Sequence, residues 1–220
     1  MRHIQVPARA GVVAPLRIAL IAGAYQEPAD FEQAGFADAV KARDLAIDLA
    51  FIAPELQHLL DRTVLDAMRT DIIAAARDAG CAQIWLGGIS LGGFIALAFA
   101  EQRPGEVDGL CLLAPYLGNR MVTSEIGHAG GLSRWRPPAL ADDDEERRLW
   151  LFIRRLRTAG PLVHLGVGRH DRFSHGHQLF ADALPDASVD VIDGGHDWPV
   201  WLQLWERFLD RISSRGMHAR

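Results

Sequence analysis

Ser90 lies between Gly88 and Gly92 in a Gly-x-Ser-x-Gly run, whose residue types and spacing suit a reactive turn. An apolar run at 84–86 precedes it and predicts a buried strand, and another at 94–100 follows it and predicts a buried helix. A tight turn between strand and helix holds its serine in a strained conformation and raises the hydroxyl above the end of the sheet. Glycines are needed at both flanks because side chains there would collide with the strand or helix. The pattern indicates that Ser90 is a nucleophile.

A serine nucleophile needs a base, and the base needs a carboxylate that orients it. The apolar run 162–168 predicts a strand, and the polar loop that follows contains Asp171. A second predicted strand at 189–193 is followed closely by His196. Because the carboxyl ends of parallel strands share one edge of a sheet, both side chains are expected beside Ser90. The sequence therefore predicts a catalytic triad of Ser90, Asp171 and His196.

Each of these assignments competes with a structural alternative. The Gly-x-Ser-x-Gly run would also suit a turn with a solvated or capping Ser90, and His196 would also suit packing at the start of the last helix. Asp193 and Asp197 lie close to His196 in sequence and are rivals of Asp171. Asp193 could solvate a turn at a strand end, whereas Asp197 is better placed to cap the last helix.

Several histidines near Asp171 raise the question of a metal site. We interpret His170, His175 and His177 as surface residues, because no cysteine or carboxylate pattern completes a zinc set. No metal ligand is therefore predicted. His164 lies inside an apolar run and is interpreted as a core histidine.

The motifs described above resemble those of the α/β-hydrolases. The resemblance is carried by residues 88–92, by the loop 168–171 and by Gly195-His196, and it extends over roughly residues 17–115 and 160–213. It implies Ser90 as nucleophile, Asp171 as the acid and His196 as the base, with no cofactor.

Two backbone N–H groups are the candidates for an oxyanion hole. The turn itself directs the N–H of Leu91 at charge that develops near the Ser90 hydroxyl. The resemblance implies a second donor in the loop after the strand at 16–22, at Ala24. Many members carry a histidine just before the glycine of this loop, where this chain has Ala22. The candidate substrate-binding residues are Tyr25, Trp135 and Trp198.

The favoured function is hydrolysis of a carboxylic ester or thioester with a small to medium acyl group. One alternative keeps the triad for acyl transfer, C–C bond hydrolysis, elimination or perhydrolysis, because a fold does not fix a reaction. Another is a non-catalytic ligand-binding module. Nucleotide binding is disfavoured, since the glycine-rich run has neither the lysine of a P-loop nor Gly-x-Gly-x-x-Gly spacing.

Alternating apolar runs and amphipathic segments predict one α/β domain over residues 1–220, with a mostly parallel central sheet covered by helices on both faces. The further strands are expected at 16–22, 46–52 and 110–114, with a short one near 3–6, and the further helices at 27–43, 63–79 and 197–212. Thr63 and Asp66 resemble a capping box at the start of one of these helices. Four residues are expected to form the buried stripe of the last helix: Trp201, Trp205, Phe208 and Ile212.

The segment 117–160 breaks this alternation and is predicted to be a small cap over the site. Leu149, Trp150 and Phe152 would join Trp135 on its inner wall. The alternative is a long irregular connection packed against the side of the domain. The segment also holds three arginines that an acidic substrate could contact: Arg120, Arg134 and Arg136.

The composition is that of an ordinary globular protein, with 49% apolar and 23% charged residues and a formal net charge of −5. No basic stripe is present, so nucleic acid is not an expected partner. Cys81 and Cys111 are expected to be buried rather than paired. The N-terminal residues lack a signal-peptide pattern and no run is long enough to span a membrane, so a cytoplasmic location is the default expectation.

Overall fold

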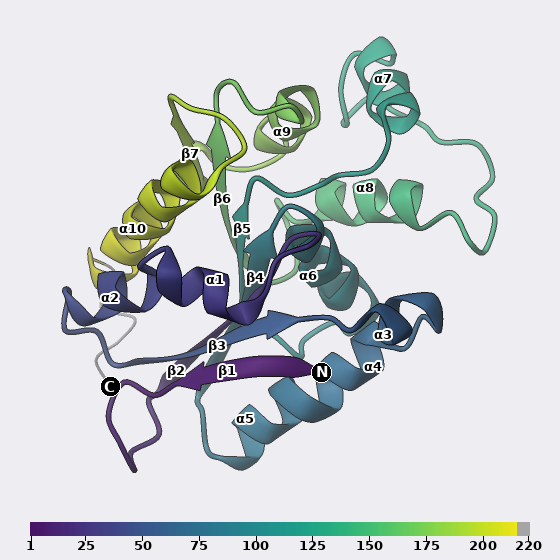
Figure 1. Ribbon diagram of the computed structural model, residues 1–220. Helices are drawn as coiled ribbons and strands as arrows, with labels where there is room; N and C mark the ends of the chain where they lie inside the picture. The colour runs from purple at the N-terminus through teal and green to yellow at the C-terminus, as the bar shows by residue number, and fades with distance from the viewer. Residues whose placement is uncertain (215–220) are drawn as a thin grey trace.

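The computed structural model describes residues 1–214, apart from the side chains of Leu56 and Leu60 (Figure 1). One sheet contains the seven described strands in the order β1-β3-β2-β4-β5-β6-β7. Only β1 runs antiparallel to its neighbour. The predicted, mostly parallel sheet is therefore confirmed. The strands are β1 (Arg2–Val6), β2 (Leu16–Ile21), β3 (Ile47–Ala53), β4 (Gln83–Ile89), β5 (Gly109–Leu113), β6 (Leu162–Gly168) and β7 (Val189–Ile192).

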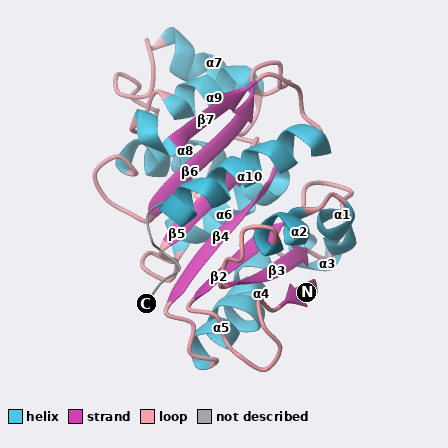
Figure 2. Ribbon diagram, turned by 90° about the vertical axis from the view of Figure 1, so that its left-hand side faces the viewer, coloured by secondary structure: helices cyan, strands magenta, loops and turns pink. Residues whose placement is uncertain are grey.

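Helices cover both faces of the sheet. Figure 2 shows α1, α2 and α10 in front of the strands, and Figure 1 shows α4, α5, α6 and α8 on the opposite side. The α-helices are α1 (Pro28–Gln33), α2 (Phe36–Lys41), α3 (Leu56–Leu60), α4 (Val64–Met68), α5 (Ala75–Asp78), α6 (Leu91–Gln102), α7 (Arg120–His128), α8 (Glu145–Arg155), α9 (Ser174–Ala181) and α10 (Trp198–Ser214). A π-helical segment (Arg69–Ala74) and a short 3-10 segment (Asp186–Ser188) complete the set.

The alternation of side chains along β2 divides the core into two layers. Leu16, Ile18 and Leu20 pack in the cluster formed with α1, α2 and α10. Ala19 and Ile21 pack in the cluster on the opposite face. Since successive side chains of a strand point to opposite faces, continuous apolar runs are the expected signature of such doubly covered strands.

The last helix begins and packs as predicted. Asp197 caps it, because its carboxylate accepts a hydrogen bond from the backbone N–H of Val200 at 3.2 Å. The four residues of its expected stripe are all buried: Trp201, Trp205, Phe208 and Ile212. Two further predictions are confirmed, since Cys81 and Cys111 are buried and free.

Two predicted helices are interrupted. The helix expected at 27–43 is split into α1 and α2 by Gly35, whose φ of +88° lies in the left-handed region that ends a helix. The helix expected at 63–79 contains the π-helical segment between α4 and α5. The expected capping box there was wrong, because Thr63 makes no side-chain cap and Asp66 binds Arg103 instead, at 2.6 Å.

The chain segment between β5 and β6 folds into α7 and α8. Helix α8 packs against α6, and α7 packs against α9. The three residues expected on its inner wall with Trp135 are buried in the core cluster on the α6 side: Leu149, Trp150 and Phe152. Among the helices that the structure describes, none is both long and apolar enough to cross a lipid bilayer.

Candidate active site

Ser90 occupies the turn between β4 and α6 in a strained conformation. Its φ of 52° and ψ of −115° are rare for a residue with a side chain, and such strain is concentrated at functional sites. A Cβ at Gly88 would lie 2.5 Å from the carbonyl oxygen of Ile21, and a Cβ at Gly92 would overlap the same oxygen. The turn therefore fits against the end of β2 only with glycine on both sides of Ser90.

His196 and Asp171 are hydrogen-bonded to each other. The ring atom Nδ1 of His196 lies 2.6 Å from Oδ2 of Asp171. The second oxygen of Asp171 accepts the backbone N–H of Phe173 at 2.8 Å, so both carboxylate oxygens are engaged. Asp171 is 2% exposed. The carboxylate thus holds the imidazole in one orientation.

The two rival carboxylates have other partners. Asp193 lies 2.9 Å from Nε2 of His170, and both side chains are exposed. Asp197 caps α10. Of the three candidates, the structure brings only Asp171 into hydrogen-bond contact with His196.

The environment of Asp171 favours its charged form. Burial raises the pKa of this carboxyl, but the hydrogen bonds from His196 and from the Phe173 backbone lower it. His177 and His196 add favourable charge interactions, and the pKa of Asp171 falls below its ordinary value. An ionised Asp171 can stabilise a positively charged imidazole.

Ser90 shares the carboxyl edge of the sheet with this pair. Ser90 follows β4, Asp171 follows β6 and His196 follows β7, and these strands run parallel in the order β4-β5-β6-β7. Within the described residues, the Ser90 hydroxyl makes no hydrogen bond with His196 or any other group. Catalytic hydrogen bonds are often long in unliganded enzymes and tighten when substrate binds.

Aromatic rings hold His196 from two sides. The ring of Phe173 meets the imidazole edge to face at a centroid distance of 5.2 Å, and the ring of Trp201 does so at 5.0 Å. Tyr116 connects Phe173 with Ser90. Its ring lies 5.5 Å from the Phe173 ring, and its backbone N–H donates to the Ser90 carbonyl at 2.9 Å. Phe173 and Tyr116 were not predicted as site residues, since the sequence indicates only that each follows a predicted strand.

The two predicted oxyanion donors lie on neighbouring segments. Leu91 is the first residue of α6, where backbone N–H groups have no partner within the helix. Ala24 follows β2 in an exposed bend, and the preceding N–H of Gly23 is bound by the side-chain oxygen of Gln26 at 2.7 Å. This hydrogen bond to Gln26 holds the loop in a chain that has Ala22 where many α/β-hydrolases carry a histidine.

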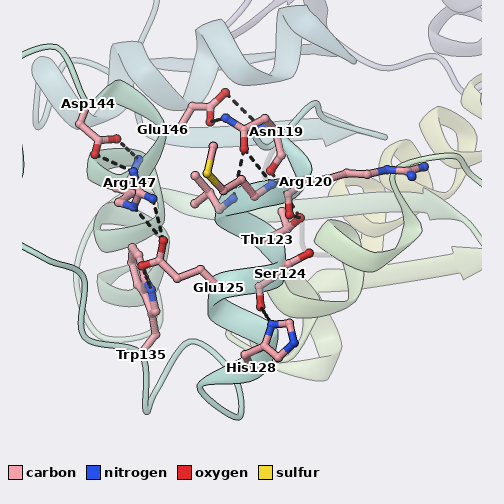
Figure 3. A network of polar contacts seen from close by, with 12 residues as sticks. Asn119, Arg120, Thr123, Ser124, Glu125, His128, Trp135, Asp144, Glu146 and Arg147 are labelled. Carbon is pink, nitrogen blue, oxygen red and sulfur yellow. Dashed lines mark hydrogen bonds and ion pairs between the residues drawn. The ribbon is translucent and has the colours of Figure 1, made fainter.

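The three predicted substrate-binding residues lie in different environments. Tyr25 is fully exposed beside Ala24. Trp198 packs edge to face against Phe31, at 5.4 Å. Trp135 is buried, and its indole N–H donates to Glu125 at 2.8 Å in the polar network of Figure 3. The structure does not bring these three residues together.

A cleft of about 490 Å³ opens next to the rings of Tyr116 and Phe173. Its inner wall includes Tyr116 and Phe173, and it runs between the first turn of α7 and the first turn of α9. The lining residues are Tyr116, Leu117, Gly118, Asn119, Arg120, Thr123, Ser124, Arg172, Phe173, Ser174, His175 and Gly176.

The polar network in Figure 3 fixes one wall of this cleft. Glu146 of α8 accepts a hydrogen bond from the side chain of Asn119 at 2.6 Å, as Figure 3 shows. It also accepts one from the Tyr116 hydroxyl at 3.2 Å. Asn119 in turn caps α7 through the N–H groups of Met121 and Val122. Burial raises the pKa of Tyr116, and the nearby Glu146 carboxylate raises it further, so Tyr116 stays a neutral donor.

The histidines near Asp171 differ from expectation in one case. His170 and His175 are exposed, as predicted. The prediction was wrong for His177, which is 1% exposed because α9 turns it toward Pro115, whose carbonyl oxygen lies 2.9 Å from Nε2. His164 is buried, as predicted, 3.8 Å from Asp190. The described residues contain no group of three or more potential metal ligands.

Comparisons by sequence find no relative: no protein-family model matches the chain, and no curated protein does. Comparisons of structure do find neighbours. Est1E from Butyrivibrio proteoclasticus, in a structure with ferulic acid bound, is 12% identical with a TM-score of 0.63, and the match covers 98% of this chain and 95% of that one. S-formylglutathione hydrolase from Staphylococcus aureus is 13% identical with a TM-score of 0.62, over 91% of this chain and 82% of the other.

A third neighbour carries the fold in its name. Alpha/beta hydrolase domain-containing protein 10 from mouse is 15% identical with a TM-score of 0.58, over 97% of this chain and 93% of that one. At such low identity the likeness concerns architecture alone. Together with the mostly parallel sheet and the strained serine turn, it shows that this chain has the α/β-hydrolase fold.

Proposed function

We propose that the protein is a serine hydrolase that cleaves a carboxylic ester or thioester of a small to medium acyl group through an acyl-enzyme on Ser90. The observation that carries the proposal is the 2.6 Å hydrogen bond between His196 and the buried Asp171, at the sheet edge where Ser90 is held in its strained turn. This combination supplies a nucleophile, a base and an orienting anion.

In the proposed reaction, Nε2 of His196 accepts the Ser90 proton as Oγ attacks the carbonyl carbon. Asp171 accepts the Nδ1–H and stabilises the imidazolium that forms. His196 then donates its proton to the departing alcohol or thiol. Water, deprotonated by the same imidazole, attacks the acyl-enzyme, and Ser90 recovers its proton as the acid leaves.

The oxyanion that forms in both steps needs donors that are already in place. The N–H of Leu91 and the N–H of Ala24 are the proposed donors, and the hydrogen bond from Gly23 to Gln26 would hold the second loop in position. A single such donor is worth about 3 kcal/mol of transition-state stabilisation in comparable sites.

Labelling with a fluorophosphonate probe tests the nucleophile. Wild-type protein should be labelled covalently, and Ser90→Ala should not. Ser213→Ala is the matched control, because Ser213 is an exposed serine in the last turn of α10, outside the cleft, and its loss should leave labelling intact. Labelling that persists in Ser90→Ala would refute the assignment.

A panel of p-nitrophenyl esters and acyl thioesters of increasing chain length tests the reaction. Turnover in water, abolished in Ser90→Ala, supports hydrolysis. Acyl transfer to an added alcohol in preference to water would favour the alternative that keeps the triad. Tight binding of a small ligand without turnover of any substrate would favour a non-catalytic module. The cytoplasmic location remains part of this proposal and is testable by fractionation.

A further inference from the structure

We propose that the cleft between α7 and α9 is a subsite for an anionic group, so that the substrate is an ester or thioester bearing a carboxylate away from the reacting carbonyl. This inference rests on the proposed function and adds a substrate class to it. It starts from two arginines that line the cleft, Arg120 at the start of α7 and Arg172 just before α9.

The cleft adjoins the candidate catalytic residues through two aromatic residues of its lining. Phe173 lines it and contacts the His196 ring at 5.2 Å. Tyr116 also lines it, and its backbone N–H is bonded to the carbonyl of Ser90. A substrate whose carbonyl reaches Ser90 would extend its remaining part past these two rings into the cleft.

The charge of the cleft is opposite to that of the whole protein. The formal net charge of the chain is −5, yet the described lining contains Arg120, Arg172 and His175 and no aspartate or glutamate. Glu146 is the carboxylate bonded to this wall, and its oxygens are engaged by Tyr116 and Asn119. The uncompensated charge in the lining is therefore positive.

Both guanidinium groups are available to a ligand. Among the described residues, neither Arg120 nor Arg172 forms an ion pair, whereas Arg147 nearby is bound by Glu125 and Asp144. Figure 3 shows the Arg120 side chain extending away from the network around Glu146. The guanidinium of Arg172 lies 4.9 Å from the centre of the Phe173 ring. This contact restricts the Arg172 side chain, so less conformational entropy is lost when a ligand binds to it.

The chemistry of the lining suits a carboxylate. A guanidinium offers two parallel N–H donors that match the two oxygens of a carboxylate. The hydroxyls of Ser124 and Ser174 add neutral donors to the same lining. An uncharged substrate tail would leave the arginines without a partner, so the cleft should discriminate by charge.

Pairs of esters that differ by one carboxylate, free in one member and methylated in the other, test this subsite in the full-length protein. One pair places the charge on the leaving group, as para-acetoxybenzoate against its methyl ester. The other pair places the charge on the acyl group. It compares the mono-p-nitrophenyl ester of adipic acid with the mixed diester in which the free carboxyl is methylated. We expect wild-type kcat/KM to favour the anionic member of at least one pair, which also identifies the side of the substrate that occupies the cleft.

Charge-removing variants then assign the preference to the arginines. Arg120→Gln and Arg172→Gln should each lower the ratio of anionic to neutral kcat/KM by about tenfold, the effect of losing a charge-assisted hydrogen bond. Arg120→Lys and Arg172→Lys should keep part of the preference. The matched control is Arg134→Gln, which removes an exposed arginine of the same segment outside the cleft and should leave the ratio unchanged.

The outcomes separate the subsite from the proposed function. If wild-type protein hydrolyses neutral and anionic esters equally, or if both Gln variants keep the wild-type ratio, the subsite is refuted and the serine hydrolase stands. An equal loss in Arg134→Gln would also refute it, because the effect would be one of overall charge. If Ser90 is not labelled and no ester is turned over, the proposed function fails and the subsite falls with it.

Discussion

The imidazole of His196 and the carboxylate of Asp171 lie 2.6 Å apart, although the two residues are 25 positions apart in the chain. Parallel β6 and β7 bring them together, because both residues follow a strand end on the same edge of the sheet. A second pair made by the same two loops, His170 with Asp193, lies exposed at 2.9 Å. The first pair is buried and the second is exposed, and substitutions in each can test which of them contributes to activity.

Asp171→Asn should lower kcat for ester hydrolysis by roughly a thousandfold or more, because a neutral amide neither fixes the imidazole tautomer nor stabilises the imidazolium. The expected change in KM is small, since Asp171 does not contact substrate in the proposed reaction. Asp193→Asn is the matched control, as it makes the same substitution at an exposed carboxylate that contacts His170 instead of His196, and it should keep wild-type kcat. Steady-state kinetics on one activated ester would measure both, and an equal loss in the two variants would contradict the assignment.

The strained serine turn makes a separate prediction about stability. Gly92→Ala would place a methyl group against the carbonyl of Ile21, which is backbone of the central strand β2 and cannot move aside. The free energy of unfolding should fall by about 2 kcal/mol or more. Gly176→Ala is the matched control in a helix, where the new methyl would make an ordinary contact with Thr123 at 3.4 Å. Urea unfolding curves that overlay for Gly92→Ala and wild type would show that the turn can relax.

The fold and the contact between Asp171 and His196 could be predicted because local sequence carries their signal. Strands covered on both faces appear as continuous apolar runs, and the runs at 84–86 and 162–168 precede Ser90 and Asp171 in the chain order that the fold requires. The serine turn could be predicted because its backbone approaches the end of β2 so closely that glycine is required at positions 88 and 92.

What could not be predicted depends on contacts between distant segments. Periodicity alone predicts one helix where Gly35 separates α1 from α2. Phe31 of α1 and Phe36 of α2 both contact the Trp198 ring of the distant last helix, at 5.4 and 5.9 Å, and no local pattern indicates this contact. The cleft forms only when the loop holding Tyr116 meets the loop holding Phe173, and neither loop carries a pattern that names the other.

Trp135 was a candidate for substrate binding and now has a structural explanation as well. Its ring is buried, and its indole N–H donates to Glu125, which also binds Arg147 at 2.7 Å. Trp135→Phe should lower the free energy of unfolding by about 1 to 3 kcal/mol, because Oε1 of Glu125 loses its donor while Oε2 keeps Arg147, and because the smaller ring leaves a cavity. KM for a neutral ester should stay within about twofold of wild type, as expected of a residue that contacts no substrate. A large rise in KM with unchanged stability would instead support the substrate-binding role.

We expect the buried His177 to make the stability of the protein depend on pH. The carbonyl of Pro115 can only accept a hydrogen bond, so Nε2 of His177 carries the proton. Nδ1 is buried and has no hydrogen-bond partner among the described residues. Burial lowers the pKa of His177, and the nearby Asp171 and the Pro115 carbonyl oppose this effect only in part. The folded protein therefore keeps this imidazole neutral at a pH where the unfolded chain has already bound a proton.

As pH falls through the unfolded pKa of about 6.5, the unfolded state gains a proton that the folded state does not, so stability is lost until the folded pKa is reached. His177→Gln removes this titration and keeps an N–H for the Pro115 carbonyl. Urea unfolding at a series of pH values should show a smaller loss of unfolding free energy on acidification in the variant than in wild type. Parallel curves over this range would mean that His177 takes up its proton equally in both states, which its burial against Pro115 and Asp171 argues against.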